Sequence, residues 1–190
     1  MDCIQAILER RSCRNFLNKK VEEEKITKIL ECGFYAPSPV NKQPWEFIVV
    51  ENKQYNDRLI EISSKAKKNA GEKSDWGWLP KMDVSFIKEV PVLIVVVGDP
   101  SRNGAEQFLE EPSKGYEHTC SASVQNMLLV AQSLGLASLW FTLFEKNDVR
   151  TLFDIDKEKD PLAIICLGYA ENFGKTPSRK GIEDKVRFIK

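Results

Sequence analysis

The sequence contains a single histidine, His118, and no Cys-x-x-Cys pair, and both shortages restrict its chemistry. Its five cysteines are an odd and scattered set, so we expect reduced thiols rather than a disulfide framework. A zinc site would need nearly all its ligands from isolated cysteines, and a Ser-His-Asp triad would have only one possible base. The sequence therefore argues against a metal site and against a hydrolytic triad.

Net charge is absent as well, because 28 basic and 28 acidic residues cancel, which argues against a nucleic-acid binder. The longest apolar run, Val90 to Val97, is interrupted by Pro91 and is too short to span a bilayer. The opening residues show no basic-then-apolar signal pattern. We expect a cytoplasmic protein with no membrane or nucleic-acid partner, and a length of 190 residues favours one domain over residues 1–190.

The dinucleotide fingerprint G-x-G-x-x-G is missing too. The stretch from Gly168 to Thr176 looks like a phosphate-binding P-loop, but five residues separate Gly168 and Gly174 where that motif needs four. Pro177 also biases Thr176 away from helical geometry, so no helix follows to receive phosphates. If a nucleotide or flavin binds, other residues must hold its phosphate.

Apolar periodicity predicts a chain of alternating helices and strands. Asp2 is predicted to be a helix N-cap, and Gly135 is predicted to end a long buried helix. Residues 101–116 are predicted to be a long loop or an excursion with one short helix, and residues 171–190 an extended tail. The predicted helices are 3 to about 11, 22–36, 52–70, 119–134 and 146–153, and the predicted strands are 46–51, 92–97, 137–143 and 162–169.

A basic cluster follows the first predicted helix, in Arg10-Arg11-Ser12-Cys13-Arg14. One interpretation is a solvated cluster that satisfies the helix dipole, because cations are common at helix C-termini. The other is an anion site, because guanidinium groups bind phosphate oxygens in pairs and such charge-assisted bonds are strong.

A second motif is the proline-rich loop of residues 36–45, which leads into the first predicted strand. Its three prolines fix φ and make the loop rigid. Ser38, Asn41 and Gln43 can donate or accept hydrogen bonds, which suits the polar edge of a ring or its hydroxylated chain. Taken alone, the same polar groups could equally satisfy the backbone of the turn.

Together the two motifs resemble the FMN-dependent nitroreductase family, which has R-R-S-x-R-x-F near its start and A-P-S-x-x-N-x-Q-P-W before a strand. Residues 10–16 (RRSCRNF) and 36–50 (APSPVNKQPWEFIVV) fit these patterns. Residues 123–141 (SVQNMLLVAQSLGLASLWF) are similar to the family's buried helix, Gly-Leu turn and following strand. The resemblance implies an α+β fold, a three-layer α-β-α sandwich with a mostly antiparallel central sheet, and a homodimer.

The resemblance also implies roles for individual residues. Arg10 and Ser12 would hold the FMN phosphate and ribityl chain, and Arg14 would reach the N1 and O2 side of the ring, where hydride addition at N5 leaves negative charge. Residues of the 36–45 loop would approach the flavin from the partner subunit. Arg179, helped by Lys180 or Lys175, would contact the phosphate. The implied cofactor-binding residues are Arg10, Arg11, Ser12, Arg14, Pro37, Ser38, Pro39, Asn41, Gln43, Trp140, Phe141, Thr142, Leu143, Arg179 and Lys180.

The implied activity is hydride transfer from NAD(P)H through flavin N5 to a nitroaromatic, quinone or similar acceptor, with no side chain acting as acid or base and with no metal. Alternatives are reductive dehalogenation or flavin fragmentation on the same fold, or a flavin-binding protein without turnover. Three residues depart from the family pattern: Pro39 replaces a small hydroxyl residue, Thr142 an acidic residue and Leu143 a glycine. Trp76 and Trp78 are either a lid that stacks on substrate or anchors of a surface segment.

Overall fold

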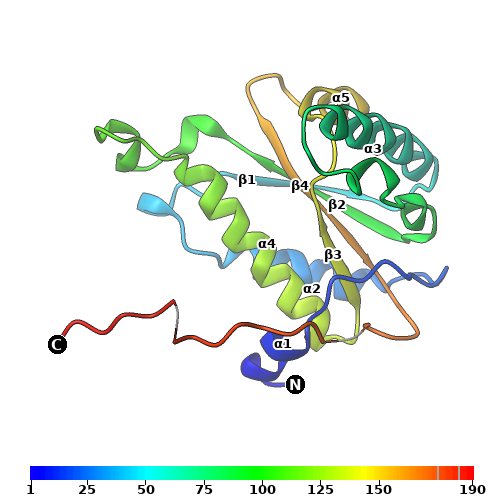
Figure 1. Ribbon diagram of the computed structural model, residues 1–190, viewed down its shortest axis with the longest axis horizontal. Helices are drawn as coiled ribbons and strands as arrows, with labels where there is room; N and C mark the ends of the chain where they lie inside the picture. Colours follow the sequence, from blue (N-terminus) through cyan, green and yellow to red (C-terminus); the bar gives the residue numbers. More distant parts are fainter. Residues whose placement is uncertain (175, 184) are drawn as a thin grey trace.

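A four-stranded antiparallel sheet forms the centre of the chain (Figure 1). The computed structural model describes residues 1–174, 176–183 and 185–190. The strands are β1 (Trp45–Val50), β2 (Val92–Gly98), β3 (Ala137–Phe141) and β4 (Asp160–Gly168), in the order β1-β2-β4-β3. Every residue of β2 is buried, as its unbroken apolar run predicts for a central strand.

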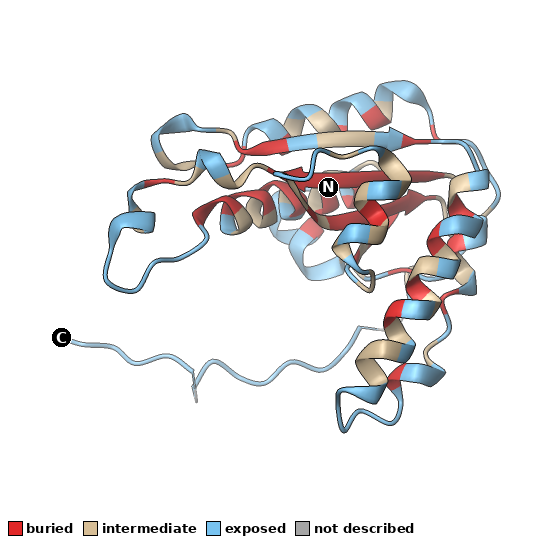
Figure 2. Cartoon of the chain, turned by 90° about the horizontal axis from the view of Figure 1, so that it is seen from above, coloured by how far each residue is buried: buried red, intermediate tan, exposed pale blue. Residues whose placement is uncertain are grey.

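Helices cover both faces of this sheet, which confirms the three-layer architecture. On one face, Ile94 of β2 packs in a core cluster with Met127 of α4 (Gly115–Ser133) and Ile29 of α2 (Glu23–Phe34). On the other face, Leu93 of β2 packs with Leu59 of α3 (Gln54–Glu72), in a cluster that also includes α5 (Lys146–Phe153). Figure 2 shows the buried residues concentrated on the strands between the helical layers.

The helix α4 is the buried helix of the fold, as its small and apolar residues predict. Val124, Met127 and Ala131 are fully covered. Gly135 takes a φ of +72° just past the helix end, where a left-handed residue terminates the hydrogen bonding. The helix begins at Gly115, four residues before the predicted start. In the described residues, no helix is long and apolar enough to cross a membrane.

The first helix, α1, spans Cys3–Glu9 and ends two residues before the predicted end. Asp2 is its N-cap, since its Oδ1 accepts a hydrogen bond of 2.8 Å from the Gln5 backbone N–H. The apolar face predicted for this helix is largely uncovered: Ile4 is 71% exposed and Leu8 is 66% exposed. An apolar face of this kind on a single chain is typical of a surface that meets another molecule.

Among the described residues, short 3-10 turns occur in the segments without a predicted element. These turns are Pro39–Asn41, Leu79–Lys81, Ser85–Glu89, Pro100–Arg102 and Ala105–Phe108. The last two lie where we predicted a loop or one short helix. The described part of the tail beyond Gly168 has neither helix nor strand, and Figure 2 shows it running exposed to the C-terminus.

Candidate functional site

A hollow of about 400 Å³ lies between the end of α1 and the start of the tail. Arg10, Arg11 and Ser12 line it from one side, and Arg179 lines it from the other together with Phe173, Gly174 and Pro177. No acidic residue is among these lining residues. Burial, with the charges of Arg11 and Arg179 beside it, lowers the pKa of the Arg10 guanidinium. Like charges gathered without a carboxylate favour binding of an anion here.

Arg11 links the helix to the tail. Its Nη1 donates to the Leu8 and Arg10 carbonyls at 2.6 and 2.7 Å, and its Nη2 donates to Thr176 Oγ1 at 2.7 Å. Among the described residues its Nε is buried without a hydrogen-bond partner. The helix-capping interpretation of the basic cluster therefore fits Arg11, which donates to carbonyls at the end of α1. The Nε of Arg11 and the like charges around Arg10 favour an additional anionic group, such as a phosphate, in the hollow.

Arg14 lies on a short segment that is pinned to the sheet at both ends. The Cys13 N–H donates to the Ser138 carbonyl of β3 at 3.0 Å, and the Leu17 N–H donates to the Tyr169 carbonyl at 2.8 Å. Along this segment Cys13 and Phe16 are buried, whereas Arg14 and Asn15 between them are exposed. The backbone on either side of Arg14 is thereby fixed beside the start of β3 and the end of β4, and the Arg14 side chain is exposed.

The residues from Trp140 to Leu143 lie at the end of β3 and just beyond it. Trp140 and Phe141 belong to core clusters on opposite faces of the sheet, as alternation requires. Thr142 and Leu143 follow the last strand residue. In the part of the chain that the structure describes, no protein acceptor receives the backbone N–H of Thr142 or Leu143. Both N–H groups are available to a ligand.

The loop of residues 37–43 lies elsewhere. It leads into Trp45, which pairs with Gly98, and Gly98 pairs with Asp160 at the start of β4. Ser138, beside Ser12, pairs with Leu167 near the other end of β4. From Asp160 to Leu167 the strand advances by seven residue steps, which is about 23 Å at 3.3 Å per residue. Within one chain, the loop that carries Pro37, Ser38, Pro39, Asn41 and Gln43 is thus remote from the basic hollow. Figure 1 shows the segment before β1 well apart from α1.

Residues of the tail complete the wall of the basic hollow. Arg179 lines the hollow, and Lys180 follows it as an exposed residue. Lys175, the other expected helper, lies outside the described residues. Phe173 and Thr176 also reach the basic cluster, although sequence reasoning did not select them. They belong to the stretch that imitates a P-loop, so the only sequence signal near them was misleading.

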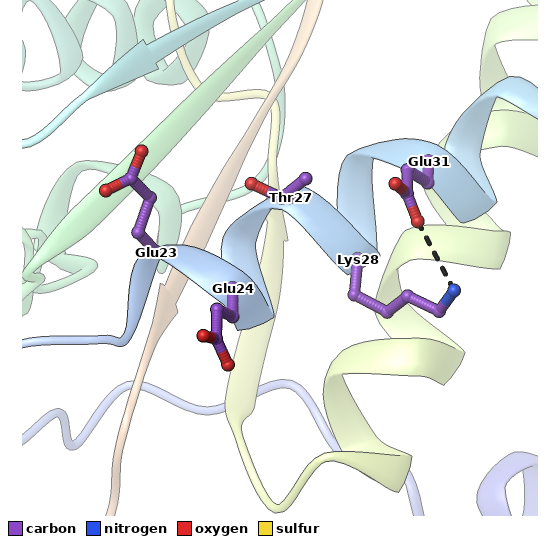
Figure 3. A pocket seen from close by; sticks show the side chains of 5 residues that line it. All are labelled: Glu23, Glu24, Thr27, Lys28 and Glu31. Carbon is purple, nitrogen blue, oxygen red and sulfur yellow. Dashed lines mark hydrogen bonds and ion pairs between the residues drawn. The ribbon is translucent and has the colours of Figure 1, made fainter.

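A second hollow has the wrong charge for the same task. It lies on the outer side of α2 and is lined by Glu23, Glu24, Thr27, Lys28 and Glu31 (Figure 3). Lys28 is paired with Glu31 at 3.3 Å, which leaves the other carboxylates without a nearby cation in this hollow. An anionic cofactor would be repelled here. We interpret this surface as an ordinary solvated helix face.

The remaining candidates do not join the site. Burial raises the pKa of the Cys120 and Cys166 thiols to about 12, so both are neutral at pH 7 and neither is a ready nucleophile. Trp76 and Trp78 stack on each other, with ring centroids 5.5 Å apart, and both are more than half exposed. This exposed pair lies on the surface segment between α3 and β2.

Comparison with known proteins gives the family. The model of the Nitroreductase family matches residues 7–169. A protein of Methanothermobacter thermautotrophicus named "Putative NADH dehydrogenase/NAD(P)H nitroreductase" is 35% identical over 179 residues, which cover 92% of this chain and 81% of that protein.

Two solved structures share the fold. An "FMN-dependent Nitroreductase" of Clostridium difficile R20291 superposes with a TM-score of 0.74 at 26% identity, covering 97% of this chain and 98% of that one. An iodotyrosine deiodinase bound to FMN and 3-iodo-L-tyrosine superposes with a TM-score of 0.83 and covers all of both chains, and at 22% identity it shows the fold alone. The family match spans most of the sequence and includes the basic cluster and the loop, so this chain belongs to the nitroreductase family.

Proposed function

We propose that this protein is a homodimeric, FMN-dependent oxidoreductase that passes hydride from NAD(P)H to a nitroaromatic, quinone or similar acceptor. The observation that carries the proposal is the basic hollow, in which Arg10, Ser12 and Arg179 converge without a carboxylate. The names of relatives support the cofactor and the donor, because one is an FMN-dependent nitroreductase and another an NAD(P)H nitroreductase.

The residues of the hollow fit the phosphate of FMN. Arg10 and Arg179 offer guanidinium donors and Ser12 offers a hydroxyl, while Arg11 holds the tail in place and Lys180 adds a cation beside it. Burial first, and then the charges of Arg11 and Arg179, lower the pKa of Arg10, and a bound dianionic phosphate would offset these charges. The cluster therefore gains more from a bound anion than three isolated surface arginines would gain.

The ring would lie along the surface between Arg14 and the end of β3. Bound FMN supplies hydride acceptance and donation at N5, so the chain needs only to bind, orient and tune it. Arg14 would place positive charge beside the N1 and O2 edge of the ring, and the N–H groups of Thr142 and Leu143, which have no protein acceptor among the described residues, could donate to the ring. Trp140 and Phe141 anchor this strand in the two cores.

Exposed apolar surface on the single chain supports the proposed dimer. The face of α1 with Ile4 and Leu8 is exposed, and so are Phe34 and Tyr35 at the end of α2. A second chain would bury such surface. The loop with Pro37, Ser38, Pro39, Asn41 and Gln43 is too far from Arg14 of its own chain, so we place it against the flavin of the partner subunit.

Membership of the family does not decide the acceptor, since the deiodinase that binds 3-iodo-L-tyrosine has the same fold. The decisive experiment is an absorbance spectrum of the purified protein followed by anaerobic titration with NADH and NADPH. We expect a yellow dimer that loses its flavin absorbance with one nicotinamide per FMN and regains it on addition of a nitroarene or quinone.

Other results would contradict the proposal in distinguishable ways. A colourless protein that takes up no added FMN would refute the cofactor. A yellow protein that nicotinamides bleach very slowly or not at all would favour flavin binding without turnover. A yellow protein that reacts with iodotyrosine but not with nitroarenes or quinones would favour reductive dehalogenation, and loss of the flavin itself under oxygen would favour its fragmentation.

A further inference from the structure

The loop before β1 has an unusual backbone. Val40, Asn41 and Gln43 take φ values of +49°, +54° and +46°, and Asp154 is the other non-glycine residue with positive φ in the described chain. Asparagine tolerates this left-handed region, whereas a β-branched residue such as Val40 strongly disfavours it. Three such residues within four positions require outside contacts that keep the loop in this shape.

Arg102 supplies one of these contacts. Its Nη1 donates to the Lys42 and Gln43 carbonyls at 3.4 and 3.3 Å, and its Nε is paired with Asp99 Oδ2 at 3.2 Å. One planar guanidinium thus bridges a carboxylate and two carbonyls of the strained loop. A lysine, with a single nitrogen, cannot reproduce both sides of this bridge.

Asp99 is itself fixed to the sheet, so the bridge has a rigid base. Its backbone N–H donates to the Pro44 carbonyl at 2.8 Å, next to the Trp45–Gly98 pair of strands β1 and β2. Its Oδ1 accepts hydrogen bonds from the Ser101 N–H at 2.9 Å and the Ser101 hydroxyl at 2.6 Å. The carboxylate is therefore held in place before it pairs with Arg102.

Gly104 supports the other end of the loop. A Cβ atom placed on Gly104 would lie 2.4 Å from Cβ of Pro39, closer than real side chains approach. The backbone of residue 104 therefore touches the first turn of the loop, and only glycine fits. The segment from Asp99 to Gly104 contacts the loop at both ends, at Pro39 and at the Lys42–Gln43 carbonyls.

We infer that Arg102 is a positioning residue that holds the 38–44 loop in its left-handed conformation and thereby raises FMN affinity in the site of the partner subunit. The second half of this inference, the effect on FMN affinity, rests on the proposed function. The first half, that Arg102 holds the loop, concerns this chain alone and can be tested without cofactor.

The first test measures amide hydrogen exchange of the loop in the full chain. The N–H groups of Asn41 and Lys42 donate to the Ser38 and Pro39 carbonyls, and that of Gln43 donates to Ser38 Oγ. In Arg102→Ala we expect these three amides to exchange about tenfold faster, and in Arg102→Lys severalfold faster. The matched control is Arg58→Ala, which removes an exposed arginine paired with Glu61 on α3 and should leave the loop unchanged.

The second test measures FMN affinity and its rescue. We expect Arg102→Ala to weaken FMN binding about tenfold, and Gly104→Ala to weaken it as well by displacing Pro39. Adding Val40→Gly to Arg102→Ala should recover most of the affinity, because glycine adopts the left-handed region without strain. A residue that merely stabilised the fold would not be rescued by a glycine.

A mixed dimer locates the effect in the partner subunit. When an Arg14→Ala chain is paired with an Arg102→Ala chain, one site carries both changes and the other carries neither, so half the sites should bind FMN with native affinity. Two equally weakened sites would overturn the action across subunits.

The remaining outcomes are also decisive. Unchanged exchange in Arg102→Ala would overturn the holding role, and faster exchange with unchanged FMN affinity would overturn the link to the cofactor. A native chain that binds no FMN would refute the proposed function and the cofactor half of this inference, while the exchange data would still decide the first half.

Discussion

The two ends of the sheet differ in whether their basic side chains are paired with carboxylates. At the end near α1, Arg10, Arg11 and Arg179 gather without a carboxylate among the residues that line their hollow. At the other end, cations are paired: Arg102 with Asp99, and Lys146 and Arg150 with Asp160. Cations without a neighbouring carboxylate indicate a site for an anionic ligand, whereas cations paired with carboxylates indicate structural support. Substitutions at the two ends should therefore have different effects on FMN affinity and on stability.

The double variant Arg10→Ala with Arg179→Ala should show the largest loss. Two charge-assisted contacts disappear, so FMN binding should weaken by about 3 to 6 kcal/mol, more than a hundredfold. Because the removed charges repel one another, the chain without cofactor should melt no lower than the native chain. Equilibrium titration and thermal melts measure both quantities. A large drop in melting temperature without cofactor would mean that the cluster is structural.

Arg14→Ala should have the next effect. The loss of one charge-assisted contact should weaken FMN binding by about 1.5 to 3 kcal/mol or lower the flavin reduction potential, because the cation that we propose beside N1 and O2 would be removed. Redox titration against a reference dye measures the potential, with Arg58→Ala as the control. Native affinity together with native potential would remove Arg14 from this role.

Asp160→Asn removes the carboxylate that pairs with Lys146 and Arg150 at the other end of the sheet. It should lower the stability of the fold and leave FMN affinity nearly unchanged. Burial raises the pKa of Asp160, but hydrogen bonds from Lys146 and Tyr116 outweigh it and hold the pKa below its ordinary value. The carboxylate therefore stabilises the fold above the unfolded pKa, about 3.9, and this stability is lost as pH falls through the lower folded value. At pH 7 we expect a loss of about 1 to 3 kcal/mol.

Denaturant unfolding at several pH values checks this sign. The difference between Asp160→Asn and the native chain should shrink as the solution is acidified below pH 4, because the native carboxylate is then also neutral. A gap that stays constant with pH would show that packing, not charge, holds this end of the sheet.

A change of salt concentration should give the smallest change in FMN affinity, and it distinguishes the arginine cluster from Arg102. Raising the salt concentration screens the attraction between the arginine cluster and a phosphate, so native FMN affinity should fall severalfold. The ratio of affinities between the native chain and Arg102→Ala should stay nearly constant, because Arg102 acts through backbone geometry. Titrations at low and high salt measure both. A ratio that collapses at high salt would mean that Arg102 acts as a long-range charge.

Local sequence patterns predicted the elements whose burial is regular. The run from Val92 to Val97 gave a central strand, and the period of Lys146–Phe153 gave a helix with those ends. The start of α4 was missed because distant contacts decide it. The Tyr116 N–H donates to Asn103 Oδ1 at 2.9 Å, and its hydroxyl donates to Asp160 Oδ2 at 2.7 Å.

The same limit applies between α3 and β2. Asn56 Nδ2 donates to the Ile87 and Val90 carbonyls at 2.8 Å each, and no periodicity within residues 71–89 encodes that contact. At the site, the sequence motif selected Arg10, Ser12 and Arg179, which the structure brings together. It could not reveal the left-handed backbone of Val40, because a β-branched residue argues against that conformation.

The hydrogen bond between Arg11 and Thr176 has a wider consequence, because the tail forms one wall of the hollow that it helps to close. Docking of the C-terminal segment and retention of a bound anion are then thermodynamically linked, and each stabilises the other by the same free energy. If FMN occupies this hollow, a chain trimmed before residue 173 should lose FMN by dissociation while it keeps its fold. Resistance of the intact terminus to exopeptidase digestion would in turn report how full the coenzyme site is.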